Sequence, residues 1–247
     1  MIVVIRIFSL AVISCLFTII SYGQAPNSSF QCGDYLTDPR DGQTYRTVQI
    51  GTQCWRAENL NTGVRISVVK DQRDNGIIEK YCYDNQDESC KIYGGLYQWD
   101  EAVQYLYGQG TKGICPPVEG WHVPSDKDWC TLAMFLDTTV NCAAWGPTGT
   151  EAGTKLKSTG TVDKKTGLWL DTDKDASNKS GFSAIPAGTR SIYAKYYYLG
   201  YHAYFWTSSD SNTLNAWFYY LKYSNKSIYR ESYFKASGYS VRCVRND

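Results

Sequence analysis

The sequence predicts an α+β fold in which two helices are followed by a run of short antiparallel strands. Between residues 94 and 136, apolar residues recur at helical spacing. After residue 180 the chain breaks into short apolar and aromatic segments that are typical of strands. An even number of cysteines outside the apolar N-terminus further indicates a fold stapled by disulfide bonds.

Residues 1–23 are predicted to be a secretory signal peptide, because an apolar run with one positive charge, Arg6, is followed by small and polar residues. A membrane anchor is the less favoured alternative. Cys15 follows Val-Ile-Ser, as in a lipoprotein cleavage box, but the apolar residues after it argue against lipid attachment. We therefore expect a secreted or cell-surface protein whose mature form has no transmembrane segment. Residues 24–37 are predicted to be a short lead-in to one domain over residues 38–247.

Eight cysteines remain once Cys15 leaves with the signal peptide, and an even number in an exported chain predicts four disulfides. A zinc site is the weaker alternative, because the chain has no Cys-x-x-Cys knuckle and its two histidines lie far apart. Close spacing suggests two pairs and leaves two others: Cys82 with Cys90, Cys130 with Cys142, Cys32 with Cys54, and Cys115 with Cys243.

The first elements of the predicted domain are a hairpin and a helix. Tyr45–Ile50 alternates polar and apolar residues, Gly51 and Thr52 turn the chain, and Gln53–Arg56 returns. A strand at Val64–Val69 is a weaker prediction. Gly94–Tyr107 carries apolar residues close to helical spacing, which predicts the first helix.

The second helix is predicted to begin at Ser125, because Ser125 and Asp128 form a Ser-x-x-Asp capping pattern. The apolar residues after this start follow at helical spacing and should face the core: Trp129, Leu132, Ala133 and Leu136.

Residues 148–180 are polar and contain glycines, which predicts a long surface excursion. Asp171, Asp173 and Asp175 alternate like the start of a calcium loop, but Ala176 and Phe182 stand where that loop requires Gly and Glu. A solvated loop is therefore favoured, and neither a metal nor another cofactor is expected. Four strands are predicted in the rest of the chain: Phe182–Ile185, Tyr204–Ser208, Ala216–Leu221 and Tyr239–Val244.

Twelve of the 21 tyrosines lie after Gly181, among Ser, Asn and Lys residues. They cannot all fill a core, because each buried hydroxyl needs a hydrogen-bond partner. The alternation of strand faces should bury about half of them. Exposed tyrosines among small polar residues are typical of recognition surfaces. The formal net charge of +1 leaves no broad basic surface, so a nucleic-acid partner is not expected.

Several sequence blocks occur in a fixed order: Asp38–Tyr45, Val48–Leu60, Gly113–Asp126, Gly181–Arg190, Phe205–Ser209, Asn215–Trp217 and Ser240–Arg245. Together they closely resemble the Fibrobacter succinogenes major paralogous domain, a family of exported bacterial domains, over nearly all of residues 38–247. The resemblance implies a C-type-lectin-like fold, shared with formylglycine-generating-enzyme-type domains and with the receptor proteins that retroelements diversify.

The resemblance also implies roles for individual residues. His122 is expected to be structural, and Arg190, Arg242 and Arg245 to pair with carbonyls or carboxylates. The tryptophans expected to form core and framework are Trp55, Trp121, Trp129, Trp206 and Trp217.

In the retroelement-diversified relatives, the segment that corresponds to residues 218–237 carries the variable ligand contacts, while positions matching Arg230 and Lys235 belong to the framework. By this resemblance the candidate ligand contacts are Phe218, Tyr220, Tyr223, Glu231, Ser232, Tyr233, Phe234, Ala236 and Ser237.

The sequence therefore predicts an exported domain that binds a protein or glycan non-covalently through a tyrosine-rich C-terminal face. A self-associating component of the cell envelope is the main alternative. An enzyme related to the formylglycine-generating domains is less favoured, because that chemistry needs reactive cysteines and complete disulfide pairing would remove them.

Overall fold

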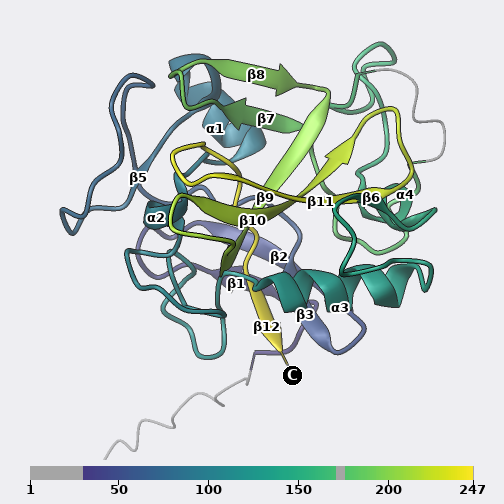
Figure 1. Ribbon diagram of the computed structural model, residues 1–247. Coiled ribbons are helices and arrows are strands. Elements are labelled where there is room, and N and C mark those ends of the chain that lie inside the picture. Colours follow the sequence, from purple (N-terminus) through teal and green to yellow (C-terminus); the bar gives the residue numbers. More distant parts are fainter. Residues whose placement is uncertain (1–29, 171–175, 247) are drawn as a thin grey trace, which may run out of the picture. The chain divides into compact units, whose positions relative to one another are not determined.

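The computed structural model describes residues 30–170 and 176–246 (Figure 1). The predicted signal peptide and Cys15 lie outside the described residues, as do Asp171, Asp173 and Asp175, so the structure does not bear on the leader or on the calcium-like loop. Among the described residues, no group of three or more His, Cys, Asp or Glu side chains could hold a metal ion.

A four-stranded sheet joins the start of the described chain to its end, in the order β1-β2-β3-β12. The predicted hairpin is confirmed, with β2 and β3 pairing antiparallel across Gly51 and Thr52. The last strand lies beside β3, where Figure 1 marks the C-terminus. The strand bounds are Tyr35–Thr37 for β1, Thr44–Ile50 for β2, Gln53–Arg56 for β3 and Val244–Asn246 for β12.

The larger sheet has six strands in the order β6-β11-β10-β9-β7-β8. Its neighbours pair antiparallel, except that β7 and β9 are parallel. The strand bounds are Gly146–Thr148 for β6, Ala187–Arg190 for β7, Tyr196–Leu199 for β8, His202–Asp210 for β9, Asn215–Lys222 for β10 and Ile228–Phe234 for β11. A short parallel pair, β4 (Val64–Arg65) and β5 (Glu79–Lys80), lies apart from both sheets.

The predicted helix after Ser125 is confirmed as α3, Asp126–Leu136. The hydroxyl of Ser125 accepts from the backbone N–H of Asp128, and the Asp128 carboxylate accepts from the backbone N–H of Ser125, which completes a capping box. The other helical segments are short: η1 (Tyr83–Asn85), α1 (Asp87–Tyr93), α2 (Trp99–Ala102) and α4 (Ala152–Leu156).

The main core lies between α3 and the six-stranded sheet, which run alongside each other in Figure 1. The ring of Trp129 on α3 stacks on Tyr219 with 5.2 Å between centroids, and it also contacts Trp55 at 5.1 Å. Of the predicted framework tryptophans, Trp217 alone is half-buried; the other four are buried.

The predicted first helix over Gly94–Tyr107 is largely wrong, because only Trp99–Ala102 is helical. Gln104 and Tyr105 adopt positive φ angles of 53° and 57°, which end the helix at once. Before α2, Leu96 and Tyr97 form β-bridges instead of a helical turn. The apolar spacing up to Val103 therefore reflects burial of a largely irregular chain, while Leu106 and Tyr107 are exposed.

The prediction that residues 148–180 form a surface excursion is also partly wrong. Ala152 and Leu156 on α4 are buried in the main core, and so is Trp169. The indole N–H of Trp169 donates to the carbonyl of Ala184 at 3.1 Å, and this bond holds the excursion against the core.

Two of the four C-terminal strand predictions are confirmed, since β9 and β10 contain Tyr204–Ser208 and Ala216–Leu221. Phe182–Ile185 forms only an isolated bridge, through Ala184. The guanidinium of Arg242 donates hydrogen bonds to the carbonyls of Phe182 and Ser183. In a strand, these carbonyls would instead accept hydrogen bonds from a neighbouring strand. Within Tyr239–Val244, only Val244 belongs to a strand.

All four predicted disulfide pairs are present: Cys32–Cys54, Cys82–Cys90, Cys115–Cys243 and Cys130–Cys142. The link between Cys115 and Cys243 spans 128 residues, so in the chain-entropy model it stabilises the fold by about 4 to 5 kcal/mol. Four disulfides indicate an oxidising environment. Within the described parts of the chain, none of the helices has the length and apolar character needed to cross a membrane.

We expect that replacing Arg242 with Met will lower the free energy of unfolding by about 3 kcal/mol or more, because buried carbonyl oxygens lose their donor. Denaturant unfolding of the oxidised protein measures this change. Arg46→Met is the control, because Arg46 pairs with Glu58 on the exposed surface, where an ion pair contributes at most about 1 kcal/mol. Equal losses in the two variants would contradict the structural role of Arg242.

Candidate functional site

The two faces of the six-stranded sheet carry different sets of side chains. Phe205, Tyr219 and Leu221 point to the face that packs against α3 in the main core. The residues that alternate with them, including Tyr204, Phe218 and Tyr220, point to the opposite face. This second face, away from α3, is where the aromatic residues of the C-terminal segment gather.

The floor of this face is a cluster of nearly buried rings. Tyr204 and Tyr220 are register partners on β9 and β10, and their rings stack with 5.2 Å between centroids. Tyr239 stacks on Tyr204 at 5.0 Å and contacts Phe218 at 4.9 Å. Burial raises the pKa of Tyr204, Tyr220 and Tyr239, so their hydroxyls stay protonated and neutral at physiological pH.

Above this floor stand tyrosines that remain in contact with solvent. Tyr193 is 76% exposed, Tyr198 51%, Tyr233 44% and Tyr197 43%. Tyr197 and Tyr198 are adjacent on β8, yet both line the same cavity. Tyr198 has a φ of 64°, a left-handed conformation that interrupts the usual alternation of side chains along the strand. Its ring stacks on His202 with 4.6 Å between centroids.

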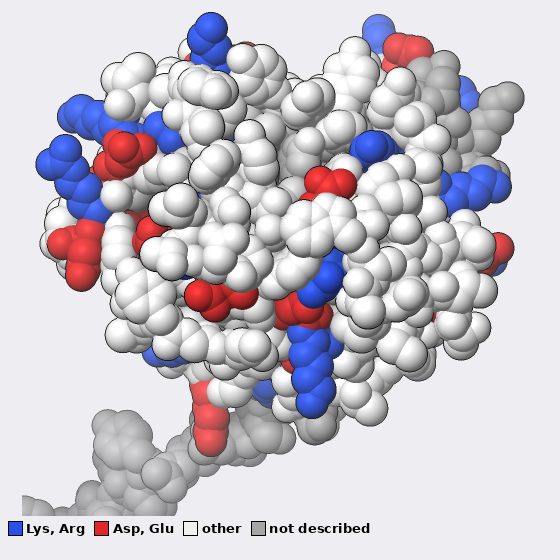
Figure 2. Space-filling model, viewed as in Figure 1, with Lys and Arg blue, Asp and Glu red and all other residues white. Residues whose placement is uncertain are grey.

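Floor and walls enclose a cavity of about 410 Å³, within the range of small-molecule sites. Its polar groups include Thr189, Ser191, Ser237 and the carboxylate of Glu231. The Tyr220 hydroxyl donates to Oε1 of Glu231 at 3.0 Å. Figure 2 shows that uncharged side chains cover most of this view of the molecule, with acidic and basic side chains interspersed among them.

The structure brings part of the predicted contact set into the cavity. The candidates that line it are Phe218, Tyr220, Glu231, Tyr233 and Ser237, although Phe218, Tyr220 and Ser237 are buried.

The other four candidates do not line the cavity. Tyr223 packs against the main core and Tyr201, and Ser232 is the register partner of Trp217. Phe234 and Ala236 are exposed beyond the cavity.

The two predicted framework residues hold the segment in place. Arg230 donates two hydrogen bonds of 2.7 Å to the carboxylate of Asp126 and lies 3.6 Å over the ring of Trp217. The ammonium of Lys235 lies 4.2 Å over Trp99. The Arg230 contact attaches β11 to the start of α3, so the sheet that carries the cavity is anchored to the core.

Residues from outside the predicted segment complete the cavity, and sequence reasoning did not assign them to it. The signal was present in the clustered tyrosines before residue 205, but only the pairing of β7, β8 and β9 places them beside β10 and β11. These additional lining residues are Thr189, Ser191, Tyr193, Tyr197, Tyr198, Tyr204 and Tyr239.

A family model described as the Fibrobacter succinogenes major domain matches residues 48–245, a stretch that contains every residue lining the tyrosine-lined cavity. The chain belongs to this family. The match confirms the resemblance drawn from the ordered sequence blocks. No curated protein and no solved structure matches the chain.

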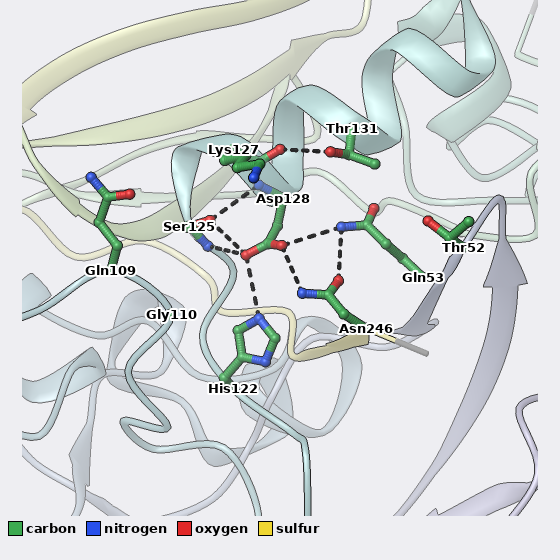
Figure 3. Close-up of a pocket in the computed structure, with 10 residues that line it drawn as sticks. All are labelled: Thr52, Gln53, Gln109, Gly110, His122, Ser125, Lys127, Asp128, Thr131 and Asn246. Carbon is green, nitrogen blue, oxygen red and sulfur yellow. Dashed lines mark hydrogen bonds and ion pairs between the residues drawn. The ribbon is translucent and has the colours of Figure 1, made fainter.

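A second cavity of this Fibrobacter succinogenes major domain, of about 470 Å³, lies at the start of α3 (Figure 3). Oδ2 of Asp128 accepts from the Ser125 hydroxyl at 2.6 Å and lies 3.3 Å from Nε2 of His122. Oδ1 accepts from the side-chain amides of Gln53 and Asn246. Serine and histidine thus both bind the carboxylate, which differs from a catalytic triad, where the histidine contacts the serine.

His122 lies between two hydrogen-bond acceptors, because Nδ1 is 3.0 Å from the carbonyl of Gly120 and Nε2 faces Asp128. Only the imidazolium form donates to both. Burial lowers the pKa of His122, but the hydrogen bonds to Asp128 and Gly120 outweigh burial and raise it. At His202 beside the tyrosines, burial and the charge of Lys222 lower the pKa to about 4, so this ring is neutral at physiological pH.

We expect the free energy of unfolding to fall as pH rises above about 6.5, the ordinary value for His, towards the raised pKa of folded His122. Below that window both states bind the proton and the contribution is fully present; within it the folded state holds a proton that the unfolded state has lost. Chemical unfolding across this pH range in wild type and His122→Gln measures the effect. A slope that is identical in the variant would show that His122 does not cause it.

Proposed function

We propose that this protein is an exported recognition domain with a C-type-lectin-like fold, and that its tyrosine-lined cavity binds part of a protein or glycan non-covalently. The observation that carries the proposal is a ring of exposed tyrosines around a cavity whose floor is already packed. Rigid aromatic side chains with few rotatable bonds provide contact area at a low entropic cost. Covering them would remove apolar surface from water without a rearrangement of the core.

The scaffold supports a recognition role because the cavity is held from several sides. Cys243, which follows soon after Tyr239 in the chain, is fixed by its disulfide bond to Cys115. The hydrogen bonds of Arg230 to Asp126 attach β11 to the start of α3. A site on packed strands keeps its geometry when a ligand arrives, so little binding energy is spent on ordering it.

The cysteines and the second cavity both favour recognition over catalysis. All eight cysteines among the described residues are in disulfides, which removes the thiolate that formylglycine-generating chemistry needs. In the second cavity, the Ser125 hydroxyl donates to Asp128 and serves the helix cap. The four disulfides also support export, for which residues 1–23 would be the signal peptide and the cell surface or the medium the destination.

Self-association is the second candidate function, and the exposure of Tyr201 and Phe234 favours it. These rings extend the aromatic surface beyond the cavity, and a second copy could cover them. The two functions can be told apart by measurement. Ligand binding in the cavity saturates at one ligand per monomer, whereas self-association increases with protein concentration.

We expect the oxidised mature protein to bind selectively on a mixed array of glycans and envelope proteins. Combining Tyr197→Ser, Tyr198→Asn and Tyr233→Ser should weaken binding at least about tenfold, because exposed aromatic anchors are lost. Asn is chosen at Tyr198 because it tolerates a positive φ. The floor tyrosines are kept, so the core stays packed.

The matched control combines Tyr35→Ser, Ile92→Ser and Leu106→Ser, three exposed apolar residues that do not line the cavity. Circular dichroism and thermal unfolding check that both variants fold. Equal loss of binding in the control would contradict a role for the cavity. Absence of array binding, together with concentration-dependent assembly in ultracentrifugation that the cavity variant abolishes, would favour the self-associating envelope component.

A further inference from the structure

The charge of the tyrosine-lined cavity is unbalanced. Among the described residues that line it, Glu231 is the one acidic residue, and none is Lys, Arg or His. The floor tyrosines stay neutral because burial raises their pKa. The cavity therefore presents a single carboxylate within an aromatic wall.

The ring faces are arranged closely around this carboxylate. Glu231 on β11 is the register partner of Phe218 on β10, and Tyr233 lies two residues further along the same strand face. Tyr220 donates its hydroxyl to Oε1 of Glu231. Within the described part of the chain, this hydroxyl is the one hydrogen-bond donor to Glu231, and no Lys, Arg or His forms an ion pair with the Glu231 carboxylate.

This combination selects the charge of a ligand. The faces of aromatic rings carry partial negative charge and attract cations. A ligand that covers Glu231 also removes it from water, which is unfavourable unless the ligand returns an opposite charge or a strong donor. A cationic group meets both demands at once, because its charge pairs with Glu231 and its alkyl stem packs on the rings.

The same sheet face already holds one ammonium of the chain itself. Lys222 lies two residues beyond Tyr220 on β10, and its Nζ is 4.3 Å over the ring of Tyr229 and 5.5 Å over Tyr220. Lys222 does not line the cavity. Its position shows that rings at this end of the sheet accept an alkylammonium as a neighbour.

We propose, building on the recognition function above, that the cavity binds an alkylammonium group, presented as a lysine side chain by a protein ligand. The stem of the side chain passes between the exposed wall tyrosines, and the ammonium lies against Glu231 and the floor rings. Affinity then depends on the charge of the ligand as well as on its shape.

The test compares two probes that differ in the ammonium alone: Nα-acetyl-lysine methylamide and Nα-acetyl-norleucine methylamide. Binding to the oxidised mature protein is measured by NMR titration at low ionic strength. We expect the lysine probe to bind at least about fivefold more tightly, and this preference to weaken as salt is added.

Glu231→Gln should abolish the preference, so that the lysine and norleucine probes bind the variant with similar affinity, because the carboxylate that pairs with the ammonium is gone. Asp163→Asn is the matched control, because it removes one negative charge from an exposed loop and should leave the preference intact. Thermal unfolding of both variants checks the fold.

Equal affinity of the two probes, or no binding of the lysine probe, would overturn the cationic ligand. If array binding is still lost in the combined variant of Tyr197, Tyr198 and Tyr233, the cavity remains the recognition site and a neutral group of a protein or a glycan is its ligand. If neither probe binds, and the combined variant binds the array as well as the wild type does, both the cationic ligand and the recognition function of the cavity are contradicted.

Discussion

The buried guanidinium of Arg242 is the contact on which the rest of this fold depends. Its Nε donates to Oδ1 of Asn59 at 2.7 Å, and its other nitrogens donate to the carbonyls of Arg56, Phe182 and Ser183. Burial lowers its pKa to about 9, yet the charge is held by carbonyl dipoles from two distant segments. One side chain thus joins the end of β3, the chain before β7 and the C-terminus beside the Cys115–Cys243 disulfide.

The six-stranded sheet explains how one sequence can serve both a core and a recognition surface. Alternation on β9 and β10 sends Phe205 and Tyr219 to α3, and Tyr204 and Tyr220 to the cavity. The first pair completes the main core, which makes the sheet rigid. The second pair forms a floor on which exposed tyrosines can stand. Tyrosine suits this boundary because its ring packs while its hydroxyl stays solvated or bonded.

Local patterns predicted those parts of the structure that local physics decides. The capping box of Ser125 and Asp128 depends on residues three apart, and the hairpin around Gly51 depends on a single turn. The segment from Gly94 to Tyr107 shows the limit of this approach. Its apolar spacing resembled a helix, but Leu96, Trp99 and Val103 are buried within a largely irregular chain that distant residues hold in place, as where Tyr239 bridges to Tyr97.

By itself, the sequence determined the α+β composition, the closely spaced disulfide pairs Cys82–Cys90 and Cys130–Cys142, the helix cap and the abundance of tyrosine near the C-terminus, because these follow from composition and short-range spacing. Only the tertiary structure decided which tyrosines face one cavity. That choice depends on the order β11-β10-β9-β7-β8 and on the positive φ of Tyr198, which bring residues from separate strands together. Strand order is a property of long-range pairing, and the alternation within a single strand carries no information about its neighbours.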